Sequence, residues 1–271
     1  MCNSAEVADL DVLLDDLAAE GQELDDAVSG TSDEQWLAPT PAEGWSVAVQ
    51  IAHLCWTDTV AIQAASDPEA FGAYLDDLLR KTSPERLSSV VDDAAFELAR
   101  EPRAELMQRW REGRPKLVEA LRAVPAGQRV PWFGPPMSAA SMATARLMES
   151  WAHGQDIFDS LHLTRSPSMR IRNIAHIGAR TRDFAFVTNG LPVPSEEFRI
   201  ELTAPDGTRW TWGPADAPQS VSGPALDFCL LVTQRRHRND LALRATGADA
   251  EVWLDIAQAF AGPPGTGRPA K

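Results

Sequence analysis

The stretch RLMESWAHGQD, residues 146–156, places a glutamate and a histidine four positions apart in a segment that predicts a helix. Residues at i and i+4 share a helix face, so Glu149 and His153 can converge on one point, and Asp156 continues that face. A carboxylate and an imidazole placed in this way could bind a divalent metal, and they could equally form an ordinary surface pair. Asp156 is a candidate catalytic residue that could hold a ligand imidazole or approach the metal, with an exposed carboxylate as the alternative.

A catalytic metal of the zinc type usually takes three protein ligands and keeps one position open, so a third ligand is needed. Among the five histidines, His53 lies in QIAHLCW, where the flanking apolar residues predict a core-facing helix. His53 is therefore the candidate partner, and a hydrogen-bonded core histidine is the alternative. Asp58 and Cys55 are not counted as ligands, because their offsets from His53 place them elsewhere around the helix.

Other side chains near these segments could complete a site. Arg146, three positions before Glu149, could orient that carboxylate or form a surface ion pair. The basic run RRHR, residues 235–238, suits an anionic substrate or a thiol cofactor, and a solvated helix end is its alternative. Four tryptophans near the motifs could line an apolar pocket or fill the core: they are Trp45, Trp56, Trp132 and Trp151.

Long helices would have to position these residues. Apolar periodicity predicts helices over 5–28, 46–65, 87–99, 103–124 and 138–161, with Ser46 and Ser138 as N-caps. Pro115 is expected to kink or split the fourth of these, because proline removes a backbone donor. Long helices within about 160 residues predict a helical bundle, whose facing helices can build a metal site.

The pattern changes after residue 165. Residues 170–187 could form one more helix, whereas EFRIELTAP, DGT and RWTWG predict a β-hairpin. PALDFCLLVTQR predicts a buried helix, LALRATG a short strand, and AEVWLDIAQAFAG a closing helix ended by glycine. We therefore expect an α+β protein with a metal-binding bundle over 1–165 and a smaller α+β domain over 166–271 that closes the cleft.

Composition limits the classes of partner. The formal net charge of −14 argues against nucleic acid as the main partner, because phosphate binding needs a basic face. The three cysteines show no paired spacing, which predicts neither disulfides nor a zinc knuckle. With no signal segment and no membrane span in the sequence, we expect a cytoplasmic monomer or homodimer that acts on small molecules.

GWSVAVQIAHL together with RLMESWAHGQD resembles the DinB-like metal-binding superfamily and, within it, the mycothiol-dependent maleylpyruvate isomerase family. The resemblance covers most of the chain and looks closest to an actinobacterial branch of metal-binding proteins. It implies an N-terminal four-helix bundle in which His53, Glu149 and His153 bind a divalent metal. Zinc is the first expectation for that metal, with nickel, iron, manganese or cobalt as alternatives.

The segment that begins at VSGPALDFCLLV is similar to the smaller C-terminal domain of that family, in which an arginine after the apolar helix faces the metal cleft. Arg235 is the best match and Arg236 is its rival, and Gln234 replaces the glycine that usually precedes this arginine. We expect catalytic roles for Arg235 and Asp156. Arg236 and Trp132 are the candidate cofactor-binding residues.

The resemblance implies a divalent-metal-dependent enzyme that uses mycothiol or another low-molecular-weight thiol, as an isomerase or a thiol transferase acting on a small molecule. The first alternative is a hydrolase or lyase that uses the same metal with water and no thiol. The second alternative is a non-catalytic stress protein that binds a metal or a small molecule.

Overall fold

The computed structural model describes residues 9–82 and 87–271, which divide into one compact unit up to Arg165 and another from Ser166 onward. The helices of the first unit are α1 (Leu10–Ser29), α2 (Asp33–Leu37), α3 (Val47–Ser66), α4 (Pro68–Lys81), α5 (Leu87–Leu98), α6 (Arg103–Ala123) and α7 (Ala139–Ser160). The first unit is therefore all-helical in its described residues, as the sequence predicts.

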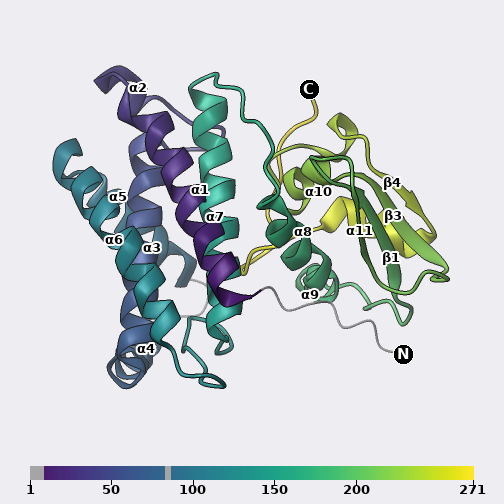
Figure 1. Ribbon diagram of the computed structural model, residues 1–271, viewed down its shortest axis with the longest axis horizontal. Coiled ribbons are helices and arrows are strands. Elements are labelled where there is room, and N and C mark those ends of the chain that lie inside the picture. Colours follow the sequence, from purple (N-terminus) through teal and green to yellow (C-terminus); the bar gives the residue numbers. More distant parts are fainter. Residues whose placement is uncertain (1–8, 83–86) are drawn as a thin grey trace. The chain divides into compact units, whose positions relative to one another are not determined.

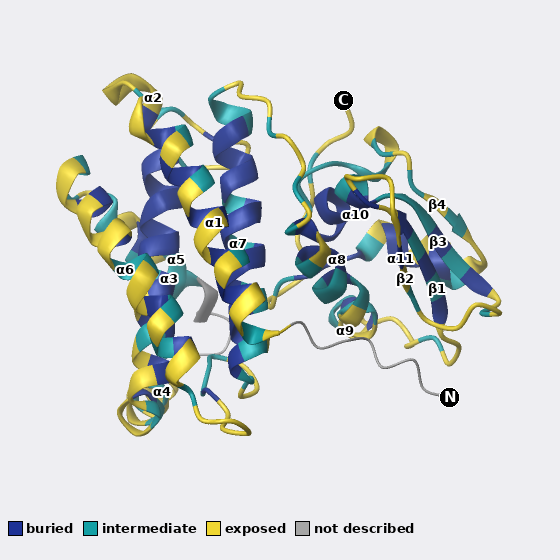
Figure 2. Cartoon of the chain, viewed as in Figure 1, coloured by how far each residue is buried: buried dark blue, intermediate teal, exposed yellow. Residues whose placement is uncertain are grey.

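Helices α1, α3, α6 and α7 lie side by side as a four-helix bundle (Figure 1). Helix α3 is the central one: its buried residues occupy all sides of the helix, and it packs against α5, α6 and α7. By contrast, α1 buries one leucine-rich stripe and exposes its acidic face (Figure 2). The polar side chains at the buried positions of α3, such as Gln50 and Asp58, lie in the interior of the bundle and need partners there.

The starts of the two motif-bearing helices follow from their capping residues. The Ser46 hydroxyl accepts a hydrogen bond from the Val49 N–H at 3.4 Å, and the Ser138 hydroxyl accepts one from the Ser141 N–H at 3.1 Å. Both predicted N-caps are therefore confirmed. Helix α6 runs through Pro115 as a single element, so the predicted split does not occur. Residues 5–8 of the first predicted helix lie outside the described residues.

The second unit contains α8 (Ile171–Arg180), α9 (Arg182–Thr188), β1 (Phe198–Thr203), β2 (Arg209–Trp212), β3 (Gln219–Pro224), α10 (Ala225–Val232), a 3₁₀ turn (Arg238–Asp240), β4 (Arg244–Thr246) and α11 (Ala248–Ile256). Its sheet has the order β2-β1-β3-β4, in which β1 pairs antiparallel with β2, parallel with β3, and β3 pairs antiparallel with β4. The predicted hairpin is β1–β2, with Ile200 opposite Trp212. The chain is therefore of the α+β class.

Helices α10 and α11 cover the apolar face of this sheet. The ring of Trp253 on α11 packs edge-on against Phe198 of β1 and Phe228 of α10, with centroids 5.7 and 5.8 Å away. Among the described residues, no helix is both long and apolar enough to cross a membrane.

Three details of the second unit differ from the expectation. The segment 170–187 forms two helices, because the Thr181 hydroxyl donates to the Gly178 carbonyl at the end of α8 and a new helix begins at Arg182. Helix α11 ends at Ile256 rather than at Gly262, since Ala257 turns away and the Ala259 N–H donates to the Val232 carbonyl. Strand β3 was not predicted, because QSVSGP offers little β-branched or aromatic content.

Candidate metal centre

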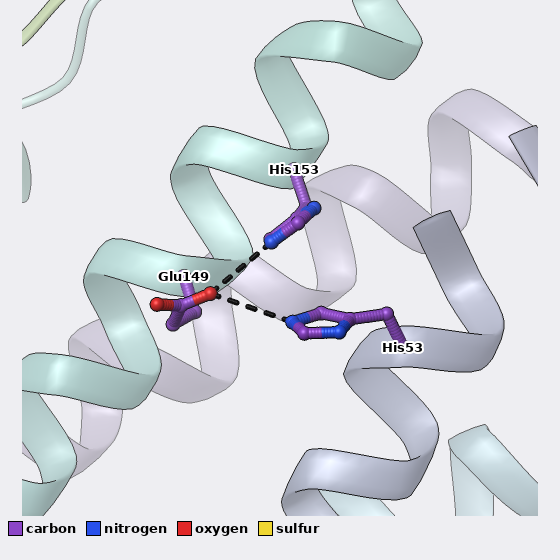
Figure 3. A group of neighbouring side chains, drawn as sticks. All are labelled: His53, Glu149 and His153. Carbon is purple, nitrogen blue, oxygen red and sulfur yellow. Dashed lines mark hydrogen bonds and ion pairs between the residues drawn. The ribbon is translucent and has the colours of Figure 1, made fainter. Parts of the chain in front are cut away.

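Three side chains converge inside the bundle, one from α3 and two from α7. Glu149 Oε2 lies 3.1 Å from His153 Nε2 and 3.5 Å from His53 Nε2. In Figure 3 one carboxylate oxygen of Glu149 faces both imidazoles, and the ring of His53 points toward it from α3. Each residue offers one ligand atom, and the three ligand atoms lie within 4.8 Å of one another. The i, i+4 spacing of Glu149 and His153 thus produces the shared face that it predicts.

The donor set suits a divalent ion. Two imidazole nitrogens and one carboxylate oxygen that bind an ion at about 2.0–2.2 Å lie roughly 3–4 Å apart, which matches the observed separations. His53 is only 8% exposed, and neither of its ring nitrogens has a hydrogen-bond partner among the described residues. The contact of its Nε2 with Glu149 Oε2, at 3.5 Å, is an ion pair longer than an ordinary hydrogen bond, so a metal held there would supply the partner that this buried nitrogen needs.

The electrostatics of the three residues favour a bound cation. Burial raises the pKa of the Glu149 carboxyl, but the interactions with His153 and His53 outweigh burial and hold that pKa well below its usual range. Glu149 is therefore an ionised carboxylate near neutral pH. An anion flanked by two imidazole nitrogens provides the charge and the lone pairs that a divalent cation requires.

Gln50 is a site residue that the sequence analysis missed. Its side-chain oxygen lies 2.5 Å from Nδ1 of His153, on the opposite edge of the ring from Glu149. Gln50 is fully buried on α3, one turn before His53. A glutamine three positions before a core histidine in an apolar helix was the available signal, because residues at i and i+3 share a face.

Aromatic side chains enclose the two histidines on one side. The ring of Trp45 stacks on His153 with centroids 5.7 Å apart and meets the edge of His53 at 5.3 Å. Phe96 of α5 packs edge-on against Trp45 at 6.0 Å. Asp92, one turn before Phe96, is half-buried: burial raises its pKa, and the charge of His53 opposes that rise. Helix α5 thus brings an apolar ring and a carboxyl into the neighbourhood of the site.

Arg146 does not orient Glu149, and it is not a surface residue. It is buried, and its guanidinium binds Asp58 through Nε at 3.0 Å and the Thr57 hydroxyl through Nη2 at 2.6 Å. The two alternatives considered for Arg146 are therefore both wrong, because Asp58 of α3 is the nearer carboxylate. Asp58 accordingly faces an arginine and lies outside the group of three ligands.

Asp156 and the remaining tryptophans occupy other places in the bundle. Asp156 is buried on α7 and does not belong to the three-ligand group, so its catalytic role stays a prediction. Trp132 packs on Phe71 and Phe133, with centroids 6.3 and 5.2 Å away, in an aromatic cluster. Its cofactor-binding role also stays a prediction. Of the four tryptophans considered, Trp45 is the one whose ring contacts both histidines.

The described cysteines are not nucleophiles of this site. Burial raises the pKa of the Cys55 thiol to about 12, and the charge of Asp58 adds to that rise. Burial also raises the pKa of Cys229 in the second unit, whose thiol donates to the Ile171 carbonyl. Cys2 lies outside the described residues. Any thiol chemistry at the three-ligand group therefore needs a thiol other than these two.

Arg235 and Arg236 belong to the second unit, where they follow α10. Gln234 adopts a φ of +57°, the left-handed conformation that glycine prefers, and the Arg235 N–H donates back to the Leu230 carbonyl at 2.8 Å. The position that carries glycine in the resembling family therefore keeps a glycine-like backbone here. The roles of Arg235 and Arg236 toward the metal and a cofactor stay predictions.

Two family models match parts of the chain. The model of the family described as mycothiol maleylpyruvate isomerase N-terminal domain matches residues 17–158, and one described as wyosine base formation matches residues 194–246. Uncharacterized proteins from two strains of Mycobacterium tuberculosis, CDC 1551 / Oshkosh and H37Rv, are each 52% identical over 262 residues. Each alignment covers 97% of this chain and 100% of theirs.

Solved structures show the same fold. Crystal structures of the mycothiol-dependent maleylpyruvate isomerase and of a histidine-to-alanine mutant of it superimpose with a TM-score of 0.56 at 16% identity. Each alignment covers 82% of this chain and 88% of the solved one. At this identity the likeness concerns the fold, and the sequence match over the bundle identifies the family. The chain belongs to the mycothiol maleylpyruvate isomerase family, as its two histidine-containing segments indicate.

Proposed function

We propose that this chain is a divalent-metal-dependent enzyme that acts on a small molecule with the help of a low-molecular-weight thiol, as an isomerase or a thiol transferase. The observation that carries the proposal is the convergence of His53, Glu149 and His153 in the bundle, with both ring nitrogens of His53 lacking a hydrogen-bond partner in the described chain. Family membership supports mycothiol as the thiol. Zinc is the first candidate ion, since it accepts a two-histidine, one-carboxylate set with an open position.

Each residue of the site has a distinct role in this proposal. His53 and His153 supply nitrogen donors, and Glu149 supplies the negative charge that makes a divalent cation more favourable than a water molecule. When bound, such an ion polarises a substrate oxygen and lowers the pKa of a coordinated thiol or water toward neutrality. Trp45 and Phe96 shield one side of the site from solvent, which strengthens the electrostatic interactions inside it.

For an isomerase, the thiol sulfur adds to a carbon–carbon double bond conjugated to a carbonyl, and the π electron pair moves onto that carbonyl. Rotation about the new single bond follows. Expulsion of the sulfur with its electron pair then restores the double bond in the other geometry, so the thiol is regenerated. The protein needs no nucleophile of its own for this sequence, consistent with the raised pKa of Cys55.

Metal analysis tests the proposal first. Wild-type protein should hold about one divalent ion per chain, and His53→Ala, His153→Ala and Glu149→Gln should lose it. His162→Asn is the matched control, because His162 is exposed in the same unit and asparagine tolerates its φ of +55°. A metal-free wild type, or full metal content in His53→Ala and His153→Ala, overturns the proposal.

Cobalt substitution tests the thiol. A thiolate that binds the cobalt form should produce a charge-transfer absorption on titration with mycothiol, and the His153→Ala protein should lack it. Turnover is measured with maleylpyruvate as the first substrate. Water-dependent turnover with no spectral response to thiols would identify a hydrolase or lyase, and neither response nor turnover on a broad panel would identify a binding protein.

A further inference from the structure

A chain of hydrogen bonds links the segment before α3 to the outer edge of His153. The Thr40 hydroxyl donates to the Trp45 carbonyl at 2.9 Å, and that carbonyl also accepts the Thr40 N–H at 2.7 Å. The Gln50 side-chain amide donates to the Thr40 hydroxyl oxygen at 2.9 Å, and its oxygen faces Nδ1 of His153 at 2.5 Å. These four groups form one continuous relay within the bundle unit.

The donor and the acceptor of every hydrogen bond in the relay follow from the Trp45 carbonyl at its end. A backbone carbonyl only accepts, so the single proton of the Thr40 hydroxyl is committed to Trp45. The group that Gln50 turns toward Thr40 must then be a donor, which is the NH₂ end of its amide. The oxygen of Gln50 is consequently the end that meets His153, and Nδ1 of His153 must carry a proton to complete the bond.

We propose that Gln50 is a positioning residue that keeps a proton on Nδ1 of His153, so that Nε2 is the ring nitrogen that faces Glu149 Oε2 at 3.1 Å and the one that an ion held there would bind. The effect of Gln50 on metal binding rests on the proposed function. The proton on Nδ1 of His153 rests on the hydrogen-bond relay alone. Without an ion, Nε2 can share a proton with Glu149 Oε2, and a bound ion replaces that proton while Nδ1–H stays hydrogen-bonded to Gln50.

The same loop also fixes the plane of the ring. Trp45, whose carbonyl anchors the relay, stacks its indole on His153 at an interplanar angle of 24°. The loop itself is closed by a bridge between Pro39 and Ser46. One short segment therefore restrains His153 in two ways, since a hydrogen bond sets its protonated edge and a ring contact sets its tilt.

Two variants test whether the side-chain oxygen of Gln50, which accepts the hydrogen bond from His153, is what matters for metal binding. Gln50→Leu keeps the approximate volume and removes the acceptor, so it should raise the metal dissociation constant about 10- to 100-fold. Gln50→Glu retains an acceptor for Nδ1–H and should bind metal at least as tightly as wild type. Gln63→Leu, at an exposed position of the same helix, is the matched control and should change nothing.

The tautomer is read directly from metal-free protein. Two-bond ¹H–¹⁵N correlation spectra with a chelator present should show a protonated Nδ1 of His153 in wild type and in Gln50→Glu. Gln50→Leu should show the Nε2–H form. Thr40→Val, which frees the amide to rotate, should show a mixture and gives the same test if Gln50→Leu fails to fold.

Different results would overturn the positioning role of Gln50 and the proposed metal-dependent function. Unchanged metal affinity in Gln50→Leu, or a His153 that keeps Nδ1–H in that variant, overturns the positioning role. Wild-type protein that binds no ion, yet shows Nδ1–H at His153 and loses it in Gln50→Leu, overturns the metal-dependent function and supports the tautomer assignment.

Discussion

The guanidinium Nε of Arg146 lies 3.0 Å from Oδ1 of Asp58, and both side chains are buried between α7 and α3. Arg146 lies one turn before Glu149, and Asp58 follows His53 by five residues. This ion pair therefore connects the two helices that carry the candidate metal ligands His53, Glu149 and His153.

Breaking this pair should destabilise the bundle strongly. Arg146→Met leaves Asp58 buried without its cation, and we expect the free energy of unfolding to fall by about 3–5 kcal/mol. The double variant Arg146→Met/Asp58→Leu removes both charges and should recover much of that loss. Urea unfolding measures each value, and Arg80→Met, at an exposed i, i+3 pair with Asp77, is the control that should stay within error. A double variant no better than the single one would contradict this account.

Removal of the metal should lower the melting temperature of the wild-type protein. An ion that binds only the folded state, present at a hundred times its dissociation constant, adds about 2.7 kcal/mol to the free energy of unfolding. Differential scanning calorimetry with and without a chelator measures the shift. The His153→Ala protein should melt at one temperature under both conditions, and an equal chelator effect on it would place the relevant ion elsewhere.

Asp25 of α1 should make bundle stability depend on acidic pH. Burial raises the pKa of this carboxyl, but hydrogen bonding to Arg111 and the charge of Arg114 outweigh burial, so the pKa lies below its usual value in the folded protein. A carboxyl whose pKa is lower when folded contributes stability at pH values above its unfolded pKa. That contribution is lost as the pH falls through its folded pKa.

Asp25→Asn should therefore lower the free energy of unfolding by about 2 kcal/mol at pH 7. The difference from wild type should shrink as the pH falls below about 4, because the carboxyl of the unfolded wild-type chain is protonated first and that of the folded protein follows at lower pH. Urea unfolding at a series of pH values measures it. Asp26→Asn, on the exposed side of the same helix, serves as the control. A difference that stays constant down to pH 3 would rule out the charge as its origin.

The family resemblance assigns Arg235 a role in turnover. Arg235→Ala should reduce the rate with mycothiol and maleylpyruvate while leaving the metal content at the wild-type level, because an arginine that stabilises negative charge is not a ligand. Arg236→Ala is the paired test. If Arg236→Ala has the larger effect at full metal content, the assignment moves to that residue, and a loss of metal in either variant would point to misfolding.

The helices of the bundle could be predicted because their signals are local. Ser46 and Ser138 each precede a long apolar segment, and both cap the predicted helix. The signals in the second unit were weaker where structure depends on distant partners. Strand β3 forms because it pairs with β1 and β4 on its two sides, and its residues QSVSGP alone do not indicate a strand.

The convergence of the ligands could be predicted in part. The spacing of Glu149 and His153 is a property of one helix, so sequence alone brings them together. Which residue of α3 contacts a given side chain of α7 depends on how the two helices are rotated about their axes. Residue spacing within one helix does not specify that rotation. For that reason neither alternative for Arg146, a place beside Glu149 or a surface ion pair, includes its contact with Asp58, and the hydrogen bond from His153 to Gln50 is not predicted either.

The burial of Cys55 and Cys229 limits how readily these two thiols react with small disulfides and oxidants. A sulfur that stays protonated and enclosed neither attacks an oxidised disulfide of the thiol pool nor reacts readily with peroxide. A protein that handles a thiol as co-reactant would otherwise risk S-thiolation of its own side chains in every oxidative episode. At these two positions the bundle and the sheet unit keep their cysteines out of that exchange.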